Sequence, residues 1–585
     1  MELARPPFPL ARMAAIWAVL SGIIVAMNAY NIAAREFPDP DDILRLVQVR
    51  DLLAGQDWFD LHQYRLDPPH GTLMHWSRLV DIPLAAILGS LTWLLGPLLA
   101  ETVTIVLVPL LTLGVVLAVV CKVADRFFSG DEVTFAGLAL GLSPLFVAQI
   151  QPLRIDHHGW QVACVMVALL GLLPGRRGRG AVLSGVALAF GLSISLEILP
   201  HLAAFGLVFG LRWLVHHDRR SLPTFLLTLT ATLGALFLAT RGLVDLAAHC
   251  DAVSPVHLAV FSTTTLATLA VAAVDPRSRL AATGLLGLSA AAGLAVLLTV
   301  TPECVSGPFG NLEPEVRHFW YENVLEGLPV WHVPAALAVP VVIGGIIALV
   351  TLARLIGISP PEERQWWTEY LIIAAVGFVA AVLTWRSQAF VGALSAVPIG
   401  WLTVRLLERL RTASTLGRKG LGGLSAVLIL LPSAPTALAK VTVGESTVQT
   451  GAMSKVTDST CALTTSVPLL NRIPAGTALA PLDIGPELLG RSHHAVVATG
   501  HHRGHAAMRD VILAFTVPPE RAREIMRQRR ARYLVFCDDL HEARLFAEEA
   551  PTGLAARLIA GRPPAWLEPI ELGQPKPFQL YRIKY

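Results

Sequence analysis

Apolar segments long enough to cross a membrane recur along most of the chain. A helix needs about 20 apolar residues to span the hydrocarbon core, and about thirteen runs approach that length before residue 438. They lie near 13–30, 101–122, 132–149, 158–174, 180–198, 201–216, 222–240, 256–274, 280–300, 332–355, 369–384, 388–405 and 421–438. The pattern predicts a polytopic α-helical membrane protein with about 13 transmembrane helices.

A further apolar stretch, 82–98, is ambiguous by length, so the charges of the loops decide its interpretation. Cytoplasmic loops are enriched in Lys and Arg. The loops of this chain that are rich in these residues all fall on the cytoplasmic side only if 82–98 does not cross the membrane. We therefore expect 82–98 to lie along the outer surface. The N-terminus is then inside. Three long segments lie outside, namely the first loop (31–100), the long loop (301–331) and the tail (439–585), with the short loop (150–157) beside them.

The tail has a different pattern from the rest of the chain. Short apolar runs at 478–483, 495–498 and 533–537 are typical of buried strands. Helical stretches near 505–515 and 519–530 separate them. The sequence therefore predicts two domains: a transmembrane domain, 1–438, and an extracytoplasmic α/β domain, 439–585.

Composition agrees with a membrane protein and excludes other classes. The 585 residues are 54% hydrophobic and only 15% charged, whereas soluble domains carry about 25% charged residues. A net charge of +3 gives no reason to expect nucleic acid as a partner. Gly and Pro are scattered without a period, which excludes collagen-like chains.

Four of the six cysteines fall on the expected outer side. These are Cys250, Cys304, Cys461 and Cys537, whereas Cys121 and Cys164 fall in or beneath the membrane. An even number of cysteines in an oxidising space permits two disulfides. We expect Cys250 to pair with Cys304 and Cys461 with Cys537; the alternative is four free buried thiols.

An acidic cluster opens the first loop. Asp39, Asp41 and Asp42 occupy three of four consecutive positions, and such carboxylates repel one another unless a cation neutralises them. Carboxylate oxygens suit hard divalent ions such as Mg²⁺ or Mn²⁺. The alternative is a solvated N-cap of the helix that follows, because Asp is a favoured capping residue.

The short loop carries a second ionisable cluster, Arg154-Ile-Asp156-His157-His158. Ionisable residues at membrane depth are costly and usually mark a functional site. An Asp and a His two positions apart can both reach one ion from a short loop. Two neighbouring surface histidines would otherwise be unremarkable, but the apolar flanks argue against that interpretation.

Three more charged residues lie near the expected outer ends of spans or in the long loop. Arg386 suits a lipid phosphate, which Arg can bind through two hydrogen bonds; the alternative is an Arg that extends to the interface. Glu326 stands beside a Gly/Pro turn in the long loop. Glu197, near the outer end of a span, can reach the same cavity.

Together these features resemble the GT-C glycosyltransferases, and more narrowly the catalytic subunit of oligosaccharyltransferases. The archaeal branch has an Asp-His-His motif in its second loop, as Asp156-His157-His158 does here. The resemblance implies that Asp156 and His158 bind a divalent metal, Mg or Mn. It also implies a GT-C fold and a sugar donor on a polyprenyl phosphate or pyrophosphate.

The resemblance assigns roles in the first and long loops as well. Bacterial members have an Asp nine residues before an Arg-Asp pair, and Asp41 stands nine residues before Arg50. Asp41 is therefore the implied metal ligand and acceptor base, with Asp39 and Asp42 as competitors. Val324-Leu-Glu326-Gly-Leu-Pro329 has the frame of the family's long-loop motif, which makes Glu326 the implied acceptor-holding residue.

In the tail the resemblance is partial. The family's W-W-D-Y-G signature, which recognises the Ser/Thr of an Asn-x-Ser/Thr acceptor, is replaced by Pro481-Leu-Asp483-Ile-Gly485. The literal Trp366-Trp367 pair lies on the cytoplasmic side and is not this signature. His501, His502 and Arg503 follow the motif and can face the chamber, with donors that suit a sugar, a carboxylate or a phosphate; the alternative is an ordinary polar surface.

The implied function is metal-dependent transfer of a glycan, with inversion, to a glycan, lipid or protein acceptor. It would occur at the periplasmic face of a bacterial inner membrane, with the N-terminus in the cytoplasm. One alternative is a GT-C monosaccharide transferase that modifies a lipid or polysaccharide, which the missing Trp pair favours. Another is a non-enzymatic lipid or polysaccharide transporter, but the ionisable residues gather on one side instead of forming a path.

Overall fold

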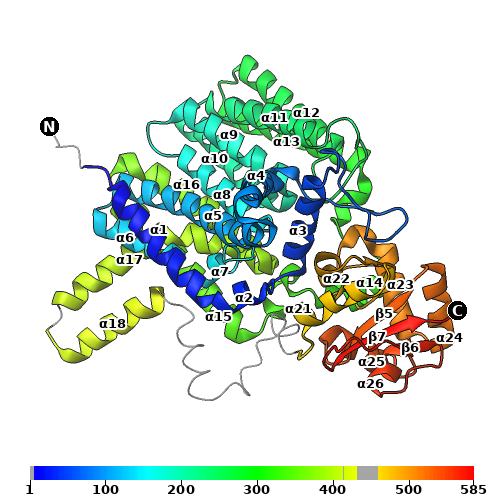
Figure 1. Cartoon of the computed structure of the whole chain (residues 1–585). Helices are drawn as coiled ribbons and strands as arrows, with labels where there is room; N and C mark the ends of the chain where they lie inside the picture. Colours follow the sequence, from blue (N-terminus) through cyan, green and yellow to red (C-terminus); the bar gives the residue numbers. More distant parts are fainter. Residues whose placement is uncertain (1–5, 413, 431–458) are drawn as a thin grey trace.

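The computed structural model describes residues 6–412, 414–430 and 459–585. A large helical body is followed by a smaller α/β unit, 459–585, called the tail domain below (Figure 1). The helical body has α1 (Leu10–Met27), α2 (Ala29–Ala34), α3 (Pro40–Leu53), β1 (His62–Gln63), β2 (Thr72–Leu73), α4 (Arg78–Leu95), α5 (Pro97–Phe127), α6 (Gly130–Gly141), α7 (Pro144–Val147), α8 (His158–Gly171), α9 (Arg177–Ile194), η1 (Leu196–Ile198), α10 (Leu199–His216), α11 (Ser221–Thr240), α12 (Pro255–Val274), α13 (Arg279–Val300), η2 (Pro302–Ser306), α14 (Pro314–Phe319), η3 (Tyr321–Asn323), η4 (Leu325–Gly327), η5 (Val330–His332), α15 (Ala335–Ile358), α16 (Pro361–Leu383), η6 (Trp385–Ser387), α17 (Gln388–Thr412) and α18 (Leu416–Leu430).

Ten helices within the described residues are long and apolar enough to cross a membrane. Two shorter apolar helices, α8 and α9, coincide with further predicted spans. The protein is thus a polytopic α-helical integral membrane protein, as the sequence predicts. The predicted span 132–149 is divided, because Pro144 starts a new helix, α7, after α6 ends at Gly141.

One predicted span and the predicted surface helix differ in how far the structure describes them. The last predicted span, 421–438, is described only to Leu430, and its end lies outside the described residues, as does the predicted domain boundary at 438. Helix α4, which contains most of 82–98, is among the ten by length and composition. The orientation of 82–98 along the membrane surface therefore stays a prediction. Gly96, in the left-handed region at φ 76°, separates α4 from α5.

The bundle packs apolar residues between helices and exposes others on its outside. Trp93 of α4 is 90% exposed, as expected for a surface that contacts lipid. In contrast, Trp366 and Trp367 of α16 are buried, and Trp366 stacks on Phe127 at the end of α5. The literal Trp pair is therefore part of the bundle core.

The tail domain is a five-stranded mixed sheet with helices around it. Its strands have the order β4-β3-β5-β7-β6; β3 is parallel to β4 and β5, whereas β7 is antiparallel to β5 and β6. The three predicted strands and both predicted helices are present, whereas β6 and β7 were not predicted. The elements are α21 (Leu463–Ser466), η8 (Val467–Arg472), β3 (Thr477–Leu479), α22 (Gly485–Arg491), β4 (Ala495–Val496), η9 (His502–Gly504), α23 (His505–Thr516), α24 (Pro519–Gln528), β5 (Tyr533–Cys537), α25 (His541–Glu549), α26 (Leu554–Ile559), β6 (Leu567–Pro569) and β7 (Phe578–Ile583).

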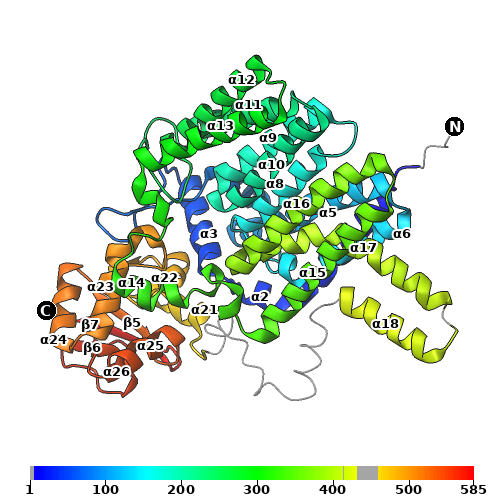
Figure 2. The same cartoon turned by 180° about the vertical axis from the view of Figure 1, so that it is seen from behind.

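The first and long loops hold the tail domain against the helical body. Both views show it beside α3 and α14 (Figures 1 and 2). The first loop extends the sheet at its β4 edge, where the Val496 N–H donates to the Arg65 carbonyl at 2.8 Å. From the long loop, Glu313 pairs with His505 at 2.8 Å. These contacts place the tail domain next to the ends of the bundle helices.

The structure contains two disulfides, Cys250–Cys304 and Cys461–Cys537. The first joins the loop before α12 to the start of the long loop, with Cα atoms 5.1 Å apart. The second joins the start of the tail domain to the end of β5. Both thus cross-link segments that the sequence places on the outer side.

Candidate functional site

A cavity of about 1990 Å³ opens between the helical body, the long loop and the tail domain. Met27 ends α1 and Gly141 ends α6, whereas Glu197 precedes α10 and Arg386 precedes α17, and all four line the cavity. Helices of opposite direction thus bring their ends to one side of the bundle. Most of the ionisable residues singled out in the sequence line this cavity.

The three acidic residues at the start of α3 have different surroundings. Asp39 is the N-cap, since its carboxylate accepts the N–H of Asp41 at 2.9 Å, and Pro40 occupies the first helical position. Arg154 of the short loop also binds Asp39 at 2.7 Å. Burial raises the pKa of Asp39, but Arg154 outweighs burial, so that this pKa is lowered.

Asp42 holds the short loop in place. Its carboxylate accepts the backbone N–H groups of Ile155 at 2.8 Å and Asp156 at 2.9 Å. Arg154 donates to its other oxygen at 3.1 Å. Asp42 is fully buried, and its acceptor positions are occupied by the protein itself. It is a positioning residue for the Asp-His-His segment.

Asp41 differs from both neighbours. Among residues 6–412, 414–430 and 459–585, none donates a hydrogen bond to its carboxylate, which lines the cavity. Burial raises the pKa of Asp41 well above its usual range, and the charges of Asp39 and Asp156 raise it further. An unpaired carboxylate among other carboxylates is an arrangement that a bound cation would relieve.

Asp156 lies at the centre of a buried network. One carboxylate oxygen receives hydrogen bonds from Arg45 at 3.2 Å and from the His157 ring at 2.6 Å. Burial opposes ionisation, but His157 and Arg45 hold the pKa of Asp156 well below its usual range. Arg45 stacks over the Trp76 ring at 4.7 Å. Asp156 is therefore a fixed anion.

The other oxygen of Asp156 faces His158. Its Oδ2 lies 3.6 Å from His158 Nε2, close to the separation of about 3.4 Å for two ligands of one tetrahedral ion at about 2.1 Å each. On the far side of the ring, His158 Nδ1 is 3.5 Å from Glu197. A carboxylate behind a ligating histidine fixes its tautomer and orientation. The donor atoms of Asp156 and His158 thus fit a divalent metal.

Arg386 and Glu326 complete this side of the cavity. Arg386 binds Glu197 at 2.6 Å, which connects it to His158. Glu326 of η4 lies 4.0 Å from Arg154, and burial, followed by the charge of Asp39, raises its pKa. Residues from five separate segments, 39–42, 154–158, Glu197, Glu326 and Arg386, therefore meet on this side of the cavity.

The histidines of the tail domain form a second cluster on the cavity wall. His501 and His502 approach His75 of the first loop, with 2.9 Å between His75 Nδ1 and His501 Nε2. Burial lowers the pKa of His75 and of His501 well below the usual range. Arg503 makes two hydrogen bonds of 2.7 Å to Asp251.

Asp483 of the altered tail motif also lines the cavity. Glu542 of α25 accepts the backbone N–H groups of Leu482 at 2.9 Å and Asp483 at 3.1 Å. This motif is thereby fixed at the end of β3. The sequence did not single out His75, Asp251 or Glu542, because each stands alone in its segment and only the folded chain gives it partners.

Comparisons with known proteins add to this geometry. No protein-family model and no curated protein matches the sequence. Among solved structures, the chain is similar to the archaeal oligosaccharyltransferase AglB from Archaeoglobus fulgidus, in complex with an inhibitory peptide and a dolichol-phosphate. The TM-score is 0.65 at 14% identity, over 98% of this chain and 76% of that one.

The chain has the GT-C fold. Two further structures of the same archaeal enzyme are similar at 14% identity. The one tethered to an acceptor peptide with the NVT sequon has a TM-score of 0.63, over 98% of this chain and 76% of that one. The complex with Zn and sulfate has a TM-score of 0.57, over 90% and 68%. The fold predicted from the sequence motifs is thus confirmed.

Proposed function

We propose that this protein is a glycosyltransferase that transfers a glycan from a polyprenyl phosphate or pyrophosphate donor to an acceptor in the cavity. Asp41 and Arg386 line one cavity of a GT-C fold, and Asp156 and His158 lie behind its wall, where Glu197 contacts both His158 and Arg386. This convergence carries the proposal. The similar archaeal enzyme, solved with a dolichol-phosphate, supports a lipid-linked donor. We further propose that the site faces the periplasm, with the N-terminus in the cytoplasm.

The cavity offers a place for both parts of such a donor. Its wall between α15, α17 and α18 is apolar, with Ile343, Ile347, Ile399 and Leu430, and suits a polyprenyl chain. Arg386 stands where this wall meets the ionisable residues. Its guanidinium can hold a phosphate through two hydrogen bonds, in exchange for its contact with Glu197.

Asp41, Asp156 and His158 would hold a divalent cation, Mg²⁺ or Mn²⁺. A bound cation supplies Lewis-acid stabilisation of the negative charge that develops on the phosphate leaving group. Glu197 orients His158, and Asp42 fixes the segment that carries Asp156.

The acceptor enters from the opposite face of the sugar. Asp41 and Glu326 have raised pKa values, which suits carboxylates that accept a proton from an incoming nucleophile. Attack from this face inverts the anomeric configuration. The acceptor's proton goes to the carboxylate, and the bond between the anomeric carbon and the phosphate oxygen breaks.

The tail motif bears on the acceptor. Pro481-Leu-Asp483-Ile-Gly485 keeps an Asp in the cavity wall but has no Trp. This favours, as a second candidate, a transferase that adds a single sugar to the hydroxyl of a lipid or polysaccharide. Fold similarity does not distinguish these acceptors, so both belong in the assay.

The test uses the purified full chain with polyprenyl phosphate- and pyrophosphate-linked donors, and with sequon peptides and lipid or polysaccharide acceptors. We expect glycosidic product that EDTA abolishes and added Mg²⁺ or Mn²⁺ restores. Asp41→Asn and His158→Ala should each reduce turnover by at least about 100-fold. The control is His493→Ala, whose ring contacts the Ile473 carbonyl and the His494 ring and does not line the cavity. Movement of donor without a new glycosidic bond would favour the transporter instead.

The proposed orientation has its own test. In the test variant, Cys121 and Cys164 are replaced by Ser, the four disulfide cysteines are kept, and Tyr585 is replaced by Cys as the one free thiol. This thiol should react with a membrane-impermeant maleimide in cells whose outer membrane is permeabilised and whose inner membrane is intact. Protection until the inner membrane is lysed would place the tail domain in the cytoplasm and contradict the proposal.

A further inference from the structure

We propose that His75, His501 and His502 form a second metal site, separate from the Asp-His-His cluster, which binds a Zn²⁺-like ion. The site goes beyond the proposed transfer reaction. His75 belongs to the first loop, between β2 and α4, whereas His501 and His502 belong to the tail domain, between β4 and α23. One nitrogen from each ring lies within 4.8 Å of the others.

The spacing of the three rings is that of a tetrahedral site. A zinc–nitrogen bond of about 2.05 Å places each ring centroid about 3.2 Å from the ion, so two ligating rings at the tetrahedral angle have centroids about 5.2 Å apart. The observed centroid separations are 5.0 Å for His75 and His501, 4.9 Å for His75 and His502, and 5.2 Å for His501 and His502. All three separations thus agree with those expected for rings that share one tetrahedral ion.

The ring nitrogens of the cluster are incompletely paired among the described residues. His501 is only 3% exposed, and its Nδ1 has no hydrogen-bond partner among the described residues. Its Nε2 contacts only another imidazole nitrogen, that of His75. Buried polar atoms are nearly always paired, and an unpaired one costs about 1–3 kcal/mol. A ligand shared by the rings would account for their burial.

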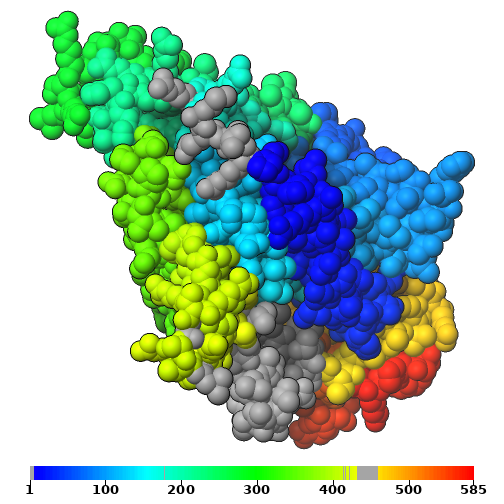
Figure 3. Space-filling model, turned by 90° about the vertical axis from the view of Figure 1, so that its left-hand side faces the viewer, coloured from blue at the N-terminus to red at the C-terminus, as the bar shows by residue number. Residues whose placement is uncertain are grey.

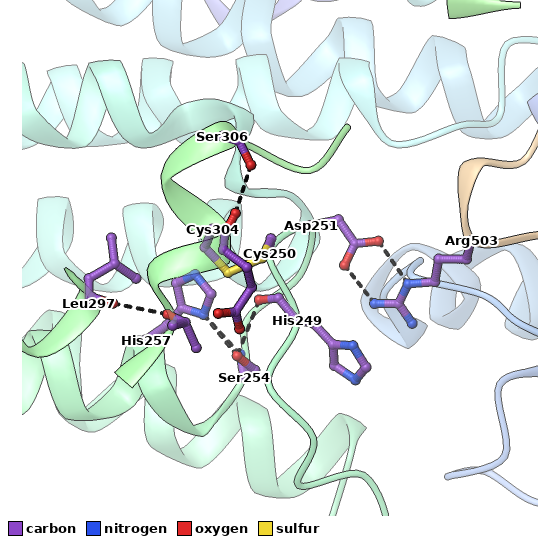
Figure 4. Close-up of a disulfide and its surroundings, with 11 residues drawn as sticks. His249, Cys250, Asp251, Ser254, His257, Leu297, Cys304, Ser306 and Arg503 are labelled. Atoms are coloured by element: carbon purple, nitrogen blue, oxygen red, sulfur yellow. Dashed lines mark hydrogen bonds and ion pairs between the residues drawn. A yellow bond between two sulfur atoms is a disulfide. The ribbon is translucent and has the colours of Figure 1, made fainter. Parts of the chain in front are cut away.

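Asp251 supplies the support that ligating histidines have in metal sites. His502 Nε2 lies 2.7 Å from the Asp251 carboxylate, which leaves Nδ1 of this ring available for the ion. Such a carboxylate fixes the tautomer and raises the basicity of the ligand. Asp251 follows Cys250 directly, so the Cys250–Cys304 disulfide anchors it, and Figure 4 shows it directed toward Arg503.

The charges around the cluster do not oppose a cation. The guanidinium of Arg503 is neutralised by Asp251, and that of Arg241, which donates to the His75 carbonyl, by Asp245. Three imidazole nitrogens favour Zn²⁺, Cu²⁺ or Ni²⁺ over Mg²⁺. The ion would tie the first loop to the tail domain, and the cavity, which all three histidines line, would supply its remaining ligand.

The experiment measures bound metal and not glycosyl transfer, so its outcome is independent of the proposed function. The purified full chain carrying Asp156→Ala and His158→Ala, which removes the other cluster, is stripped with chelator and titrated with Zn²⁺ and with Co²⁺. We expect one tightly bound Zn²⁺ per chain and the intense visible absorption of tetrahedral Co²⁺. Adding His501→Ala and His502→Ala should abolish both signals.

Asp251→Asn gives a second measurement that does not remove a ligand. We expect it to weaken Zn²⁺ binding by about 10- to 100-fold, as loss of a supporting carboxylate does elsewhere. His493→Ala, in the same domain, should leave binding unchanged. Retained Zn²⁺ stoichiometry in the His501/His502 variant, or no binding before these changes, would overturn the proposal. Equal elution profiles in size-exclusion chromatography show that the variants remain folded.

Discussion

At the scale of single residues, neighbouring carboxylates acquire different roles from their partners. Asp39 caps a helix and binds Arg154, and Asp42 accepts two backbone N–H groups of the short loop. The carboxylate of Asp41, between them, receives no hydrogen bond from the described residues, and Asp41 lines the cavity. The sequence left three competitors for one role, and the partners of each side chain now favour Asp41.

This division predicts opposite effects of two substitutions. Asp42→Ala leaves two buried N–H groups without an acceptor, and each such group costs about 1–3 kcal/mol. The free energy of unfolding should therefore fall by at least the cost of one group. Asp41→Asn removes a charge that burial disfavours, so stability should stay equal or rise while transfer is lost. Thermal unfolding of the purified variants checks both; a stability loss in Asp41→Asn as large as that of Asp42→Ala would contradict the assignment.

At the scale of elements, a single buried acid joins β3 to α25. Glu542 lies in the first turn of α25 and accepts two N–H groups from the segment after β3, which carries the altered tail motif. Burial, followed by the charge of Asp483, raises the pKa of Glu542 to about 8. The position of the motif at the cavity wall therefore depends on a carboxyl whose protonation changes near neutral pH.

A pH dependence of stability follows from this pKa. In the unfolded chain a glutamate has a pKa of about 4.3, so between that pH and about 8 the folded state holds a proton that the unfolded state has released. Stability should therefore fall as the pH rises through this window and then level off. Glu542→Gln, which stays neutral, should remove this part of the slope. The measurement compares the unfolding temperature of the full chain with that of the Glu542→Gln variant at pH values about one unit apart between pH 5 and 8. The same slope of unfolding temperature against pH in both proteins would argue against the assignment.

At the scale of the whole molecule, the two ends of the bundle carry different kinds of polar groups. The cavity end has carboxylates and histidines, and some of them, such as the Asp41 carboxylate and His501 Nδ1, have no hydrogen-bond partner among the described residues. Away from it, Arg212 of α10 makes two hydrogen bonds, at 2.7 and 2.6 Å, to Glu369 of α16. The helices beside the cavity, α1 and α18, lie on one side of the molecule, with the orange and red tail domain at the bottom of that view (Figure 3).

The Arg212–Glu369 pair is therefore expected to stabilise the fold without a part in the reaction. Glu369→Gln leaves a buried guanidinium without its counter-charge, which typically costs about 3–5 kcal/mol. We expect a lower unfolding temperature and a lower yield of folded protein, but an unchanged turnover number per folded molecule. A turnover number reduced as much as in Asp41→Asn would show that the pair communicates with the cavity.

The sequence alone determined the membrane class, most of the helices and the strands β3, β4 and β5. Hydrophobic length and alternation are local properties of the chain, and burial follows directly from them. It also singled out Asp41, Asp156, His158 and Arg386, because ionisable groups are rare in apolar surroundings.

Only the tertiary structure decided which of these residues are partners. Asp42 and Asp156 are more than a hundred residues apart, and no local pattern relates them. Neither His75 nor Asp251 stands out in the sequence. His75 joins His501 and His502 in a candidate metal site, and Asp251 comes to support His502, only when the first loop and the tail domain pack together. Ligand sets and hydrogen-bond networks depend on distances between remote segments, and the packing of apolar surfaces sets those distances.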